Sequence, residues 1–369
     1  MPVMLVTPRH SVGRDRVVVV IPAHDEAASV GATIDSALAQ TVPPDAIFVV
    51  ADNCSDDTAA IAVAHGARVL ETVGNTDKKA GALNQALEVV LPQLDGDDRV
   101  LVIDADSLLA PEWIETALAV MERPGVGAVG GIFYGEGRAG LIEQLQRNEY
   151  VRYARDVLRR GKGVWVLTGT STLFRVSVLR EIAAARGAVL PGRAGEFYDR
   201  RALAEDMEIT LASLRLGYRC VSPARCATTT ELMPTWRDLW LQRVRWQRGA
   251  IDNLRSHGVN RVTLPYLGQQ LWAVLGFLVI VGYPLLLGLS LAAGMPLVLH
   301  PFWLAMGAVC LVDRVVTVRK AGWRGIVLTL LFLPEMYYDF FRLAVYLAGW
   351  RDAVLRRTAG WHHLTAVRG

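Results

Sequence analysis

The apolar residues in the first half of the chain form short continuous runs separated by polar segments. Four runs rich in β-branched residues predict strands buried on both faces of a sheet, at 17–21, 46–50, 67–71 and 100–104. Apolar residues at helical spacing predict helices over 27–40, 58–65, 80–91 and 111–122. This alternation predicts an α/β fold, with a mixed, mostly parallel sheet that carries helices on both faces.

The second half has a different pattern, because no Asp, Glu, Lys or Arg occurs between Val262 and Val312. Two apolar runs, 267–291 and 297–318, are each long enough to cross a bilayer, which takes about 20 apolar residues. A third segment, 326–349, carries proline and charged residues near its middle. Because charge at bilayer depth is costly, we expect this segment to be either transmembrane or re-entrant.

Charge changes this picture only in the second half. Lys and Arg number 39 and Asp and Glu 36, which is too balanced for a protein that binds nucleic acid through bulk charge. Basic residues flank the apolar runs. By the positive-inside rule, we expect these flanking segments to lie in the cytosol. We therefore expect a multi-pass protein of the plasma membrane whose first half is cytoplasmic. The expected organisation is an N-terminal extension (1–16), an α/β domain (17–233), an amphipathic interfacial helix (234–261), a membrane region (262–349) and a basic tail (350–369).

Acidic residues follow the predicted strands, at the sheet edge where parallel α/β folds bind ligands. Glu26 follows the first strand and Asp52 the second, while Asp104 and Asp106 end the fourth. Alternation along an extended chain puts Asp104 and Asp106 on one side, where carboxylate oxygens suit Mg²⁺ or Mn²⁺. A solvated turn is the alternative for the aspartate pair taken alone. Lys78 and Lys79 lie just ahead of a predicted helix, where a phosphate would meet both lysine charge and the helix N-terminus; two surface lysines are the alternative.

A second polar group comes later in the chain. Residues 164–174 predict a strand broken by Gly169, where small residues allow close approach of a ligand. Glu205 and Asp206 open a predicted helix. They either complement the helix dipole or supply a general base that takes a proton from an attacking hydroxyl.

The segment 234–257 predicts a long amphipathic helix on a membrane surface. Gln242, Arg245 and Trp246 stand apart from its apolar stripe, and their spacing puts them on one face. A guanidinium binds oxyanions, and an indole offers a flat surface for a sugar ring. These three residues therefore predict a site for a diphosphate and a sugar.

Six segments resemble, in order, motifs of the processive membrane-bound family 2 glycosyltransferases, the synthases of cellulose, chitin, hyaluronan and poly-N-acetylglucosamine. They are IPAHDE (21–26), ADNCSDDT (51–58), KKAGALNQAL (78–87), DAD (104–106), AED (204–206) and QRVRW (242–246). The resemblance implies a GT-A-like fold and inverting transfer of a hexose or N-acetylhexosamine from a UDP-sugar to a growing saccharide. It also implies Mg²⁺ or Mn²⁺ as cofactor.

The resemblance also assigns roles at the matching positions. It implies donor binding by Pro22, Ala23, Glu26, Asp52, Lys79, Asp104, Asp106 and Arg245, and acceptor binding by Gly169, Thr170, Gln242 and Trp246. The catalytic pair would be Asp206, as the base, and Glu205. Asp106, together with Asp104, would hold the metal. The tail loosely resembles a gating segment with Trp361, Thr365 and Arg368, the alternative being a frayed basic terminus.

Two other functions stay open from the sequence. One is transfer of a single sugar to a lipid acceptor, and the other is an inactive nucleotide-sugar-binding membrane subunit. UDP-N-acetylglucosamine and UDP-glucose are the expected donors. The residues decide neither the linkage, nor the number of additions, nor the oligomeric state.

Overall fold

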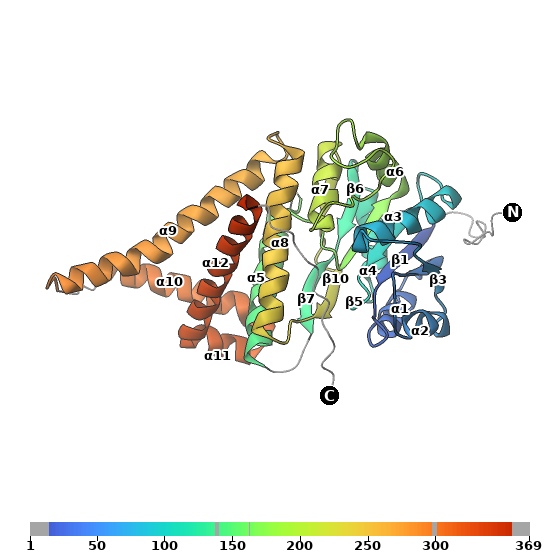
Figure 1. Cartoon of the computed structure of the whole chain (residues 1–369). Coiled ribbons are helices and arrows are strands. Elements are labelled where there is room, and N and C mark those ends of the chain that lie inside the picture. Colours follow the sequence, from blue (N-terminus) through green and yellow to red (C-terminus); the bar gives the residue numbers. More distant parts are fainter. Residues whose placement is uncertain (1–14, 137–139, 162, 297–300, 356–369) are drawn as a thin grey trace. The chain divides into compact units, whose positions relative to one another are not determined.

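The computed structural model describes residues 15–136, 140–161, 163–296 and 301–355 (Figure 1). Two compact units separate within them. The first comprises 15–136 with 153–233, and the second 140–152 with 234–355. The division falls between Met233 and Pro234. The transfer of 140–152 to the second unit was not expected from the sequence.

The first unit is built on a seven-stranded sheet with the strand order β3-β2-β1-β4-β8-β6-β9. Its strands are β1 (Val17–Ala23), β2 (Ala46–Ala51), β3 (Arg68–Glu71), β4 (Arg99–Ile103), β6 (Val126–Gly130), β8 (Ser171–Arg175) and β9 (Arg219–Val221). Only β8 runs against its neighbours, β4 and β6. The sheet is therefore mixed and mostly parallel, as the sequence predicts.

Helices cover both faces of this sheet (Figure 1). Alternate β1 residues enter opposite cores, because successive side chains of a strand point to opposite faces: Val18 and Val20 belong to one cluster, Val17 and Val19 to the other. The first cluster includes residues of α3 (Lys78–Val90), α6 (Val176–Ala185) and α7 (Glu205–Arg215). The second includes residues of α1 (Val30–Leu38), α2 (Thr58–Ala64) and α4 (Trp113–Met121). A short 3-10 helix, η1 (Leu91–Gln93), follows α3.

A smaller sheet in the same unit was not predicted. It has the order β5-β10-β7, formed by β5 (Ser107–Leu109), β10 (Ala227–Glu231) and β7 (Ile132–Glu136). The strand expected over 164–174 was also partly wrong, since only Ser171–Arg175 forms β8. Residues 167 and 168, which precede β8, form hydrogen bonds that are not part of a β-sheet. The Leu167 N–H donates to Thr210 Oγ1, and Thr168 Oγ1 donates to the Gly131 carbonyl.

The second unit is helical. It contains the first part of α5 (Leu141–Arg160), α8 (Trp236–His257), α9 (Leu264–Ala292), α10 (Pro301–Val318), the short η2 (Arg319–Ala321), α11 (Trp323–Leu331) and α12 (Leu333–Val354). α12 packs along α8, where Trp236 lies against Tyr337 and Phe341 with ring centroids 5.3 and 5.0 Å away. The expected helix over 234–257 is thus present as α8.

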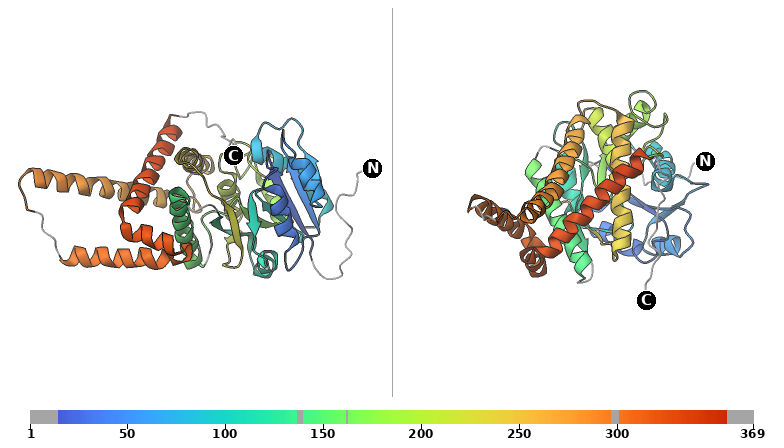
Figure 2. Two further views of the ribbon diagram at one scale, coloured as in Figure 1. Left: turned by 90° about the horizontal axis from the view of Figure 1, so that it is seen from below. Right: turned by 60° about the vertical axis from the view of Figure 1, so that its left-hand side comes forward.

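Two helices, Leu264–Ala292 and Pro301–Ala321, have the length and apolar composition needed to cross a membrane. Almost none of the residues in their most apolar stretches are buried, and Figure 2 shows α9 and α10 projecting from the other helices of the second unit. The segment 326–349 does not form one helix, because the chain breaks at Phe332, whose φ is 60°. Pro334 then lies in the first turn of α12, the helical position that tolerates proline.

Candidate active site

Two acidic residues predicted to follow strands, Asp52 and Asp104, lie at the carboxyl ends of β2 and β4. The Asp104 N–H donates to the Thr170 carbonyl oxygen at 3.2 Å. The loop ahead of β8 is thereby fixed over the end of β4, at the sheet edge where α/β folds bind ligands.

The end of β1 lies beside this edge. Pro22 and Ala23 are buried at the end of the strand, and the Ala23 carbonyl accepts a hydrogen bond from the Asp52 N–H at 2.8 Å. Three residues on, the Glu26 N–H donates to Thr58 Oγ1 at 2.8 Å. These contacts join the loops that follow β1 and β2.

Asp52 is buried and held through one carboxylate oxygen. Its Oδ1 accepts from Thr72 Oγ1 at 2.7 Å, from Asn75 Nδ2 at 2.8 Å and from Asn53 Nδ2 at 3.0 Å. Three donors on one oxygen fix the orientation of the carboxylate. Its other oxygen makes no hydrogen bond within the part of the chain that the structure describes.

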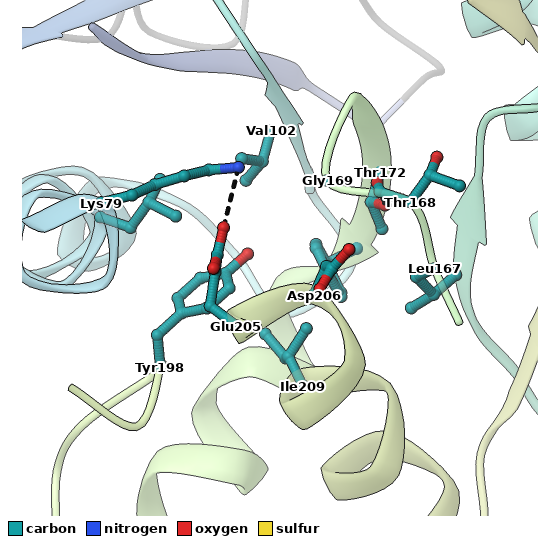
Figure 3. Close-up of a pocket in the computed structure, with 12 residues that line it drawn as sticks. Lys79, Val102, Leu167, Thr168, Gly169, Thr172, Tyr198, Glu205, Asp206 and Ile209 are labelled. Carbon is teal, nitrogen blue, oxygen red and sulfur yellow. Dashed lines mark hydrogen bonds and ion pairs between the residues drawn. The ribbon is translucent and has the colours of Figure 1, made fainter. Parts of the chain in front are cut away.

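Lys79 joins the two groups of acidic residues that the sequence identifies separately. Its Nζ lies 2.5 Å from Asp104 Oδ1 and 3.1 Å from Glu205 Oε1, and Figure 3 shows it pointing from α3 toward Glu205. Burial alone would lower the pKa of Lys79, but the two carboxylates raise it above its usual value. The lysine is therefore charged and couples α3, β4 and α7.

Gly169 marks the point where these side chains converge. A Cβ built on this residue would lie 3.2 Å from Lys79 Nζ, 3.6 Å from Asp104 Oδ2 and 3.7 Å from Asp206 Oδ2. A side chain at position 169 would occupy the space between the three charges. The absence of a side chain at position 169 leaves this space open.

Asp206 lies in the first turn of α7. Its Oδ1 accepts from the Met207 N–H at 2.7 Å, and its own carbonyl accepts from Thr210 Oγ1 at 2.6 Å. Burial, followed by the charge of Glu205, raises the pKa of Asp206 to about 6. A carboxylate with this pKa accepts a proton more readily than an ordinary aspartate at neutral pH.

Two residues of this site were missed in the sequence. Tyr198 lines, with Lys79, Glu205 and Asp206, a cavity of about 20 Å³, and it is buried (Figure 3). Asn84 holds its backbone: Nδ2 donates to the Tyr198 carbonyl at 2.8 Å, and Oδ1 accepts from the Tyr198 N–H at 3.1 Å. A buried asparagine within an apolar helix was the available signal for this contact.

Asp106 lies among other carboxylates. Burial, then Asp104, Glu26 and Glu231, raises its pKa to about 7. Thr230 of β10 pairs with Ser107 of β5 in an antiparallel ladder, so the next step of this register sets Glu231 opposite Asp106. Like charges facing each other across strands are unfavourable without a neutralising cation. Glu231 could not be found from the sequence, because its place depends on the unpredicted smaller sheet.

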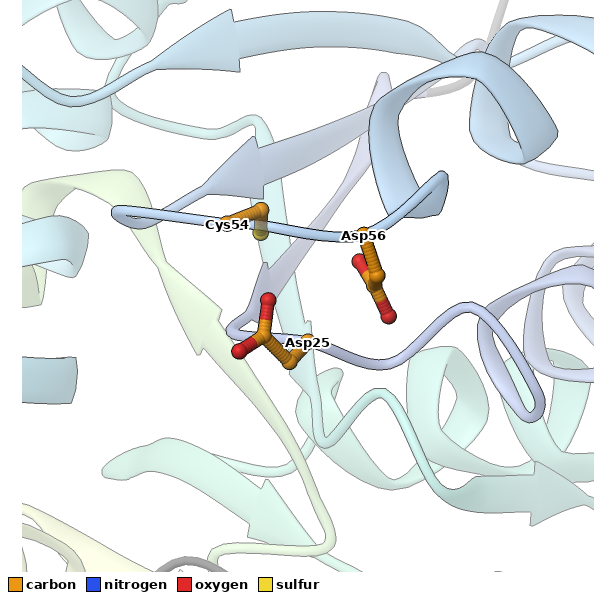
Figure 4. A group of neighbouring side chains, drawn as sticks. All are labelled: Asp25, Cys54 and Asp56. Carbon is orange, nitrogen blue, oxygen red and sulfur yellow. The ribbon is translucent and has the colours of Figure 1, made fainter. Parts of the chain in front are cut away.

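A different acidic group lies between the loops after β1 and β2 (Figure 4). Ligand atoms of Asp25, Cys54 and Asp56 lie within 4.8 Å of one another. Asp25 Oδ1 accepts from the Ser55 N–H at 2.6 Å, and Asp56 Oδ2 accepts from the Ala27 N–H at 3.0 Å. These carboxylates are thus engaged in fastening the loops to one another.

The remaining predicted residues lie on α8 in the second unit. Thr235 caps this helix by accepting the Asp238 N–H at 3.1 Å, and Gln242, Arg245 and Trp246 follow on it. Gln242 Oε1 is buried and has no hydrogen-bond partner among the described residues. An amide oxygen in this state is available to a ligand hydroxyl.

The structure thus brings together, in the first unit, Lys79, Asp104, Gly169, Glu205 and Asp206. Thr170 lies next to them, its hydroxyl 3.0 Å from that of Thr168. The candidate gating residues lie outside the described residues: they are Trp361, Thr365 and Arg368.

Known proteins give an independent view of the chain. Residues 14–249 match the family described as glycosyltransferase like family 2. A probable glycosyltransferase, YdaM of Bacillus subtilis (strain 168), is 28% identical over 250 residues, 63% of this chain and 55% of that protein. Poly-beta-1,6-N-acetyl-D-glucosamine synthase of Staphylococcus epidermidis is 23% identical over 241 residues, 63% of this chain and 53% of that protein. The chain thus spans about half the length of these relatives.

Solved structures agree with the fold. The mannosyltransferase PcManGT from Pyrobaculum calidifontis, in complex with GDP-Man and Mn²⁺, superposes with a TM-score of 0.58 at 19% identity. The match covers 96% of this chain and 92% of that chain. The GT-A-like fold implied by the sequence motifs is therefore confirmed. The family match covers more than half of the chain and includes the strand ends described above, so this chain belongs to glycosyltransferase like family 2.

Proposed function

We propose that this protein is an inverting, metal-dependent glycosyltransferase that moves a hexose or N-acetylhexosamine from a UDP-sugar to a growing saccharide. The observation that carries this proposal is the convergence of Lys79, Asp104 and Asp206 around Gly169. Lys79 Nζ, the proposed cation for the diphosphate, and Asp206 Oδ2, the proposed base, lie 3.2 and 3.7 Å from the position of a Cβ at residue 169. Relatives named as polysaccharide synthases support the same reaction class.

In the proposed reaction Asp206 takes the proton of an acceptor hydroxyl as its oxygen attacks the anomeric carbon. A bond forms between this oxygen and the anomeric carbon, while the bond from that carbon to the diphosphate oxygen breaks. The nucleoside diphosphate leaves with the electron pair of the broken bond. Because one displacement occurs, the configuration at the anomeric carbon is inverted. Burial, followed by the neighbouring charge of Glu205, raises the pKa of Asp206 and so favours its acceptance of the proton.

The donor would lie along the strand ends. Asp52 offers one carboxylate oxygen to the uridine, with Pro22, Ala23 and Glu26 beside it. Lys79 lies in the first turn of α3, so charge and helix N-terminus act together on the diphosphate. Arg245 adds a second cation in this proposal.

A divalent metal fits the residues around Asp106. Asp104, Glu26 and Glu231 surround it with negative charge, and oxygen ligands of this kind suit Mg²⁺ or Mn²⁺. A bound divalent ion would neutralise charge on the departing diphosphate. Asp106, with Asp104, would be the residues that hold it.

Chelation tests the metal requirement. With EDTA we expect transfer to fall by about 100-fold or more, since several kcal/mol of charge stabilisation are lost, and Mg²⁺ or Mn²⁺ to restore it. Transfer is measured with radiolabelled donor, and UDP binding by calorimetry with and without metal. Asp106→Asn should stay inactive when metal is restored. Full transfer in EDTA would contradict the metal role.

We propose Gln242 and Trp246 of α8, and Gly169 and Thr170 of the first unit, as acceptor-binding residues. For Trp246→Ala we expect transfer to a saccharide to fall by about tenfold, which corresponds to about 1.4 kcal/mol, because the acceptor sugar loses the flat indole surface. Hydrolysis of the donor by water should change little. Both rates are measured on the same preparation. Equal losses in both would indicate that Trp246 supports only the fold.

Residues 262–349 are proposed as the membrane region. α9 and α10 would span the bilayer, with the catalytic domain in the cytoplasm and basic flanks on the same side. The break at Phe332 leaves α11 with only 9 residues, which is too short to span, and α12 is not one of the two helices with the length and apolar composition to cross a membrane. Both observations support a re-entrant or interfacial course for 326–349. This arrangement corresponds to a plasma-membrane enzyme with a lipid-embedded anchor.

The proposal is tested with detergent-purified protein, Mg²⁺ or Mn²⁺, and a panel of radiolabelled UDP-glucose, UDP-N-acetylglucosamine and GDP-mannose. GDP-mannose is included because the superposed mannosyltransferase is named with it. A high-mass, glycosidase-sensitive product from a UDP-sugar would support a saccharide synthase. One label in the organic phase would favour the single-sugar lipid transferase. No turnover with binding retained would favour an inactive subunit.

A further inference from the structure

A carboxylate of the second unit is surrounded by donors from two other helices. Glu149 of α5 accepts from Arg243 Nη2 at 2.9 Å and from the Tyr338 hydroxyl at 2.6 Å, both on Oε2. Arg342 Nε lies 3.4 Å from its Oε1. Burial opposes ionisation, yet Arg243 and Arg342 lower the pKa of Glu149. Glu149 is therefore an anion that joins α5, α8 and α12.

Arg243 lies inside the segment QRVRW (242–246) but is not one of its three predicted site residues, Gln242, Arg245 and Trp246. Its guanidinium carbon lies 4.3 Å from the centroid of the Trp246 ring and 5.4 Å from that of Tyr150. Only 9% of Arg243 is exposed, against 36% of Trp246. The indole thus rests on a buried, ion-paired guanidinium and keeps part of its surface open.

We propose that Glu149 and Arg243 are positioning residues for Trp246: they fix the indole so that its open surface can stack on an acceptor sugar. The proposal rests on the proposed function, in which Trp246 takes the acceptor. A planar guanidinium stacks on an aromatic ring, and the attraction grows when water is excluded. Glu149 anchors the guanidinium through Nη2, so a residue on another helix contributes to the position of the indole.

A lysine substitution at position 243 tests the charge of the arginine separately from its planar shape. Arg243→Lys keeps a cation opposite Glu149 but removes the flat surface under Trp246. We expect it to raise the KM for a soluble β-linked tetrasaccharide of glucose or N-acetylglucosamine by about tenfold. The donor KM and the rate of donor hydrolysis should stay within about twofold, since Arg243 contacts neither the donor nor the base in this proposal.

Arg248→Lys is the matched control. Arg248 is a buried arginine of the same helix, and its Nε lies 2.6 Å from Asp252 Oδ2, one turn further on. We expect this variant to leave the KM for the tetrasaccharide unchanged. Glu149→Gln is the second variant, and it should raise the same KM, because the neutral amide holds Arg243 less firmly. Equal increases in KM for Arg243→Lys and Arg248→Lys would overturn the proposal.

A double-mutant cycle distinguishes positioning from general support of the fold. In the Trp246→Ala background, Arg243→Lys should have no further effect on the KM for the tetrasaccharide, because both changes remove one contact. An unchanged KM for Arg243→Lys, with a raised KM for Trp246→Ala, would overturn the positioning role alone. An unchanged KM for Trp246→Ala would overturn its acceptor role and this proposal with it.

Discussion

Asp206→Asn is expected to lower sugar transfer by about 10²–10⁴-fold and to leave UDP binding intact. The amide has nearly the shape of the carboxyl group and can still accept the Met207 N–H on its oxygen. It cannot accept the proton of the acceptor hydroxyl, so the attacking oxygen stays protonated. Transfer is measured with radiolabelled donor, and UDP binding by calorimetry on the same preparation.

The control for this substitution is Asp35→Asn. Asp35 is exposed and lies 2.8 Å from His65, away from the carboxylates of the site. We expect it to transfer sugar normally. Loss of UDP binding in Asp206→Asn, in proportion to the loss of transfer, would contradict a role limited to proton removal.

The pH dependence of the wild type tests the same assignment. The pKa of Asp206 is raised to about 6, and a general base must be ionised to act. Below this pH the carboxyl group is protonated, so kcat/KM should rise as the pH passes through about 6 and then level off. kcat/KM is the relevant quantity because it reports the free enzyme. A flat profile between pH 5 and 8 would contradict the assignment.

Arg186→Met is expected to destabilise the first unit by about 3–5 kcal/mol, because it leaves Glu208 buried without its partner. The Arg186 and Glu208 side chains are 0% and 1% exposed, and their two hydrogen bonds measure 2.8 and 2.7 Å. Arg186 also donates to the Glu196 and Phe197 carbonyls, both at 2.9 Å. It thus fastens the loop between α6 and α7, which carries Tyr198.

This loss is measured as a fall in the thermal unfolding midpoint of the purified protein, of about 10 °C. Arg225→Met is the matched control, because Arg225 of the same unit also pairs with a glutamate, Glu112, but the two side chains are 76% and 52% exposed. An exposed pair contributes about 0–1 kcal/mol. Equal shifts for the two variants would contradict a special role for the buried pair.

The sequence predicts the parts of the fold that depend on local pattern. β1, β2 and β4 are continuous apolar runs, and the position of Asp52 and Asp104 after them follows directly from the strands. Asp206 was found because acidic residues at a helix start stand out in a sequence. The six motifs then joined these separate observations into one site.

The rest depends on contacts between distant residues. β10 is a short, threonine-rich strand, and only its pairing with β5 sets Glu231 opposite Asp106. The course of 164–170 follows from hydrogen bonds to Thr210 and Gly131, which no local pattern reveals. The pairing of Glu149 with Arg243 likewise joins residues 94 positions apart.

The bridge made by Lys79 has a consequence for turnover. One ammonium group serves Asp104 and Glu205, so a diphosphate that binds Lys79 competes with both carboxylates for it. This competition lowers the affinity of the site for the donor and for the UDP product alike. In the proposed reaction the carboxylates regain the lysine as UDP departs, which shortens the time for which product blocks the site. An enzyme that adds many sugars in succession gains more from rapid release of UDP than from tight binding of the donor.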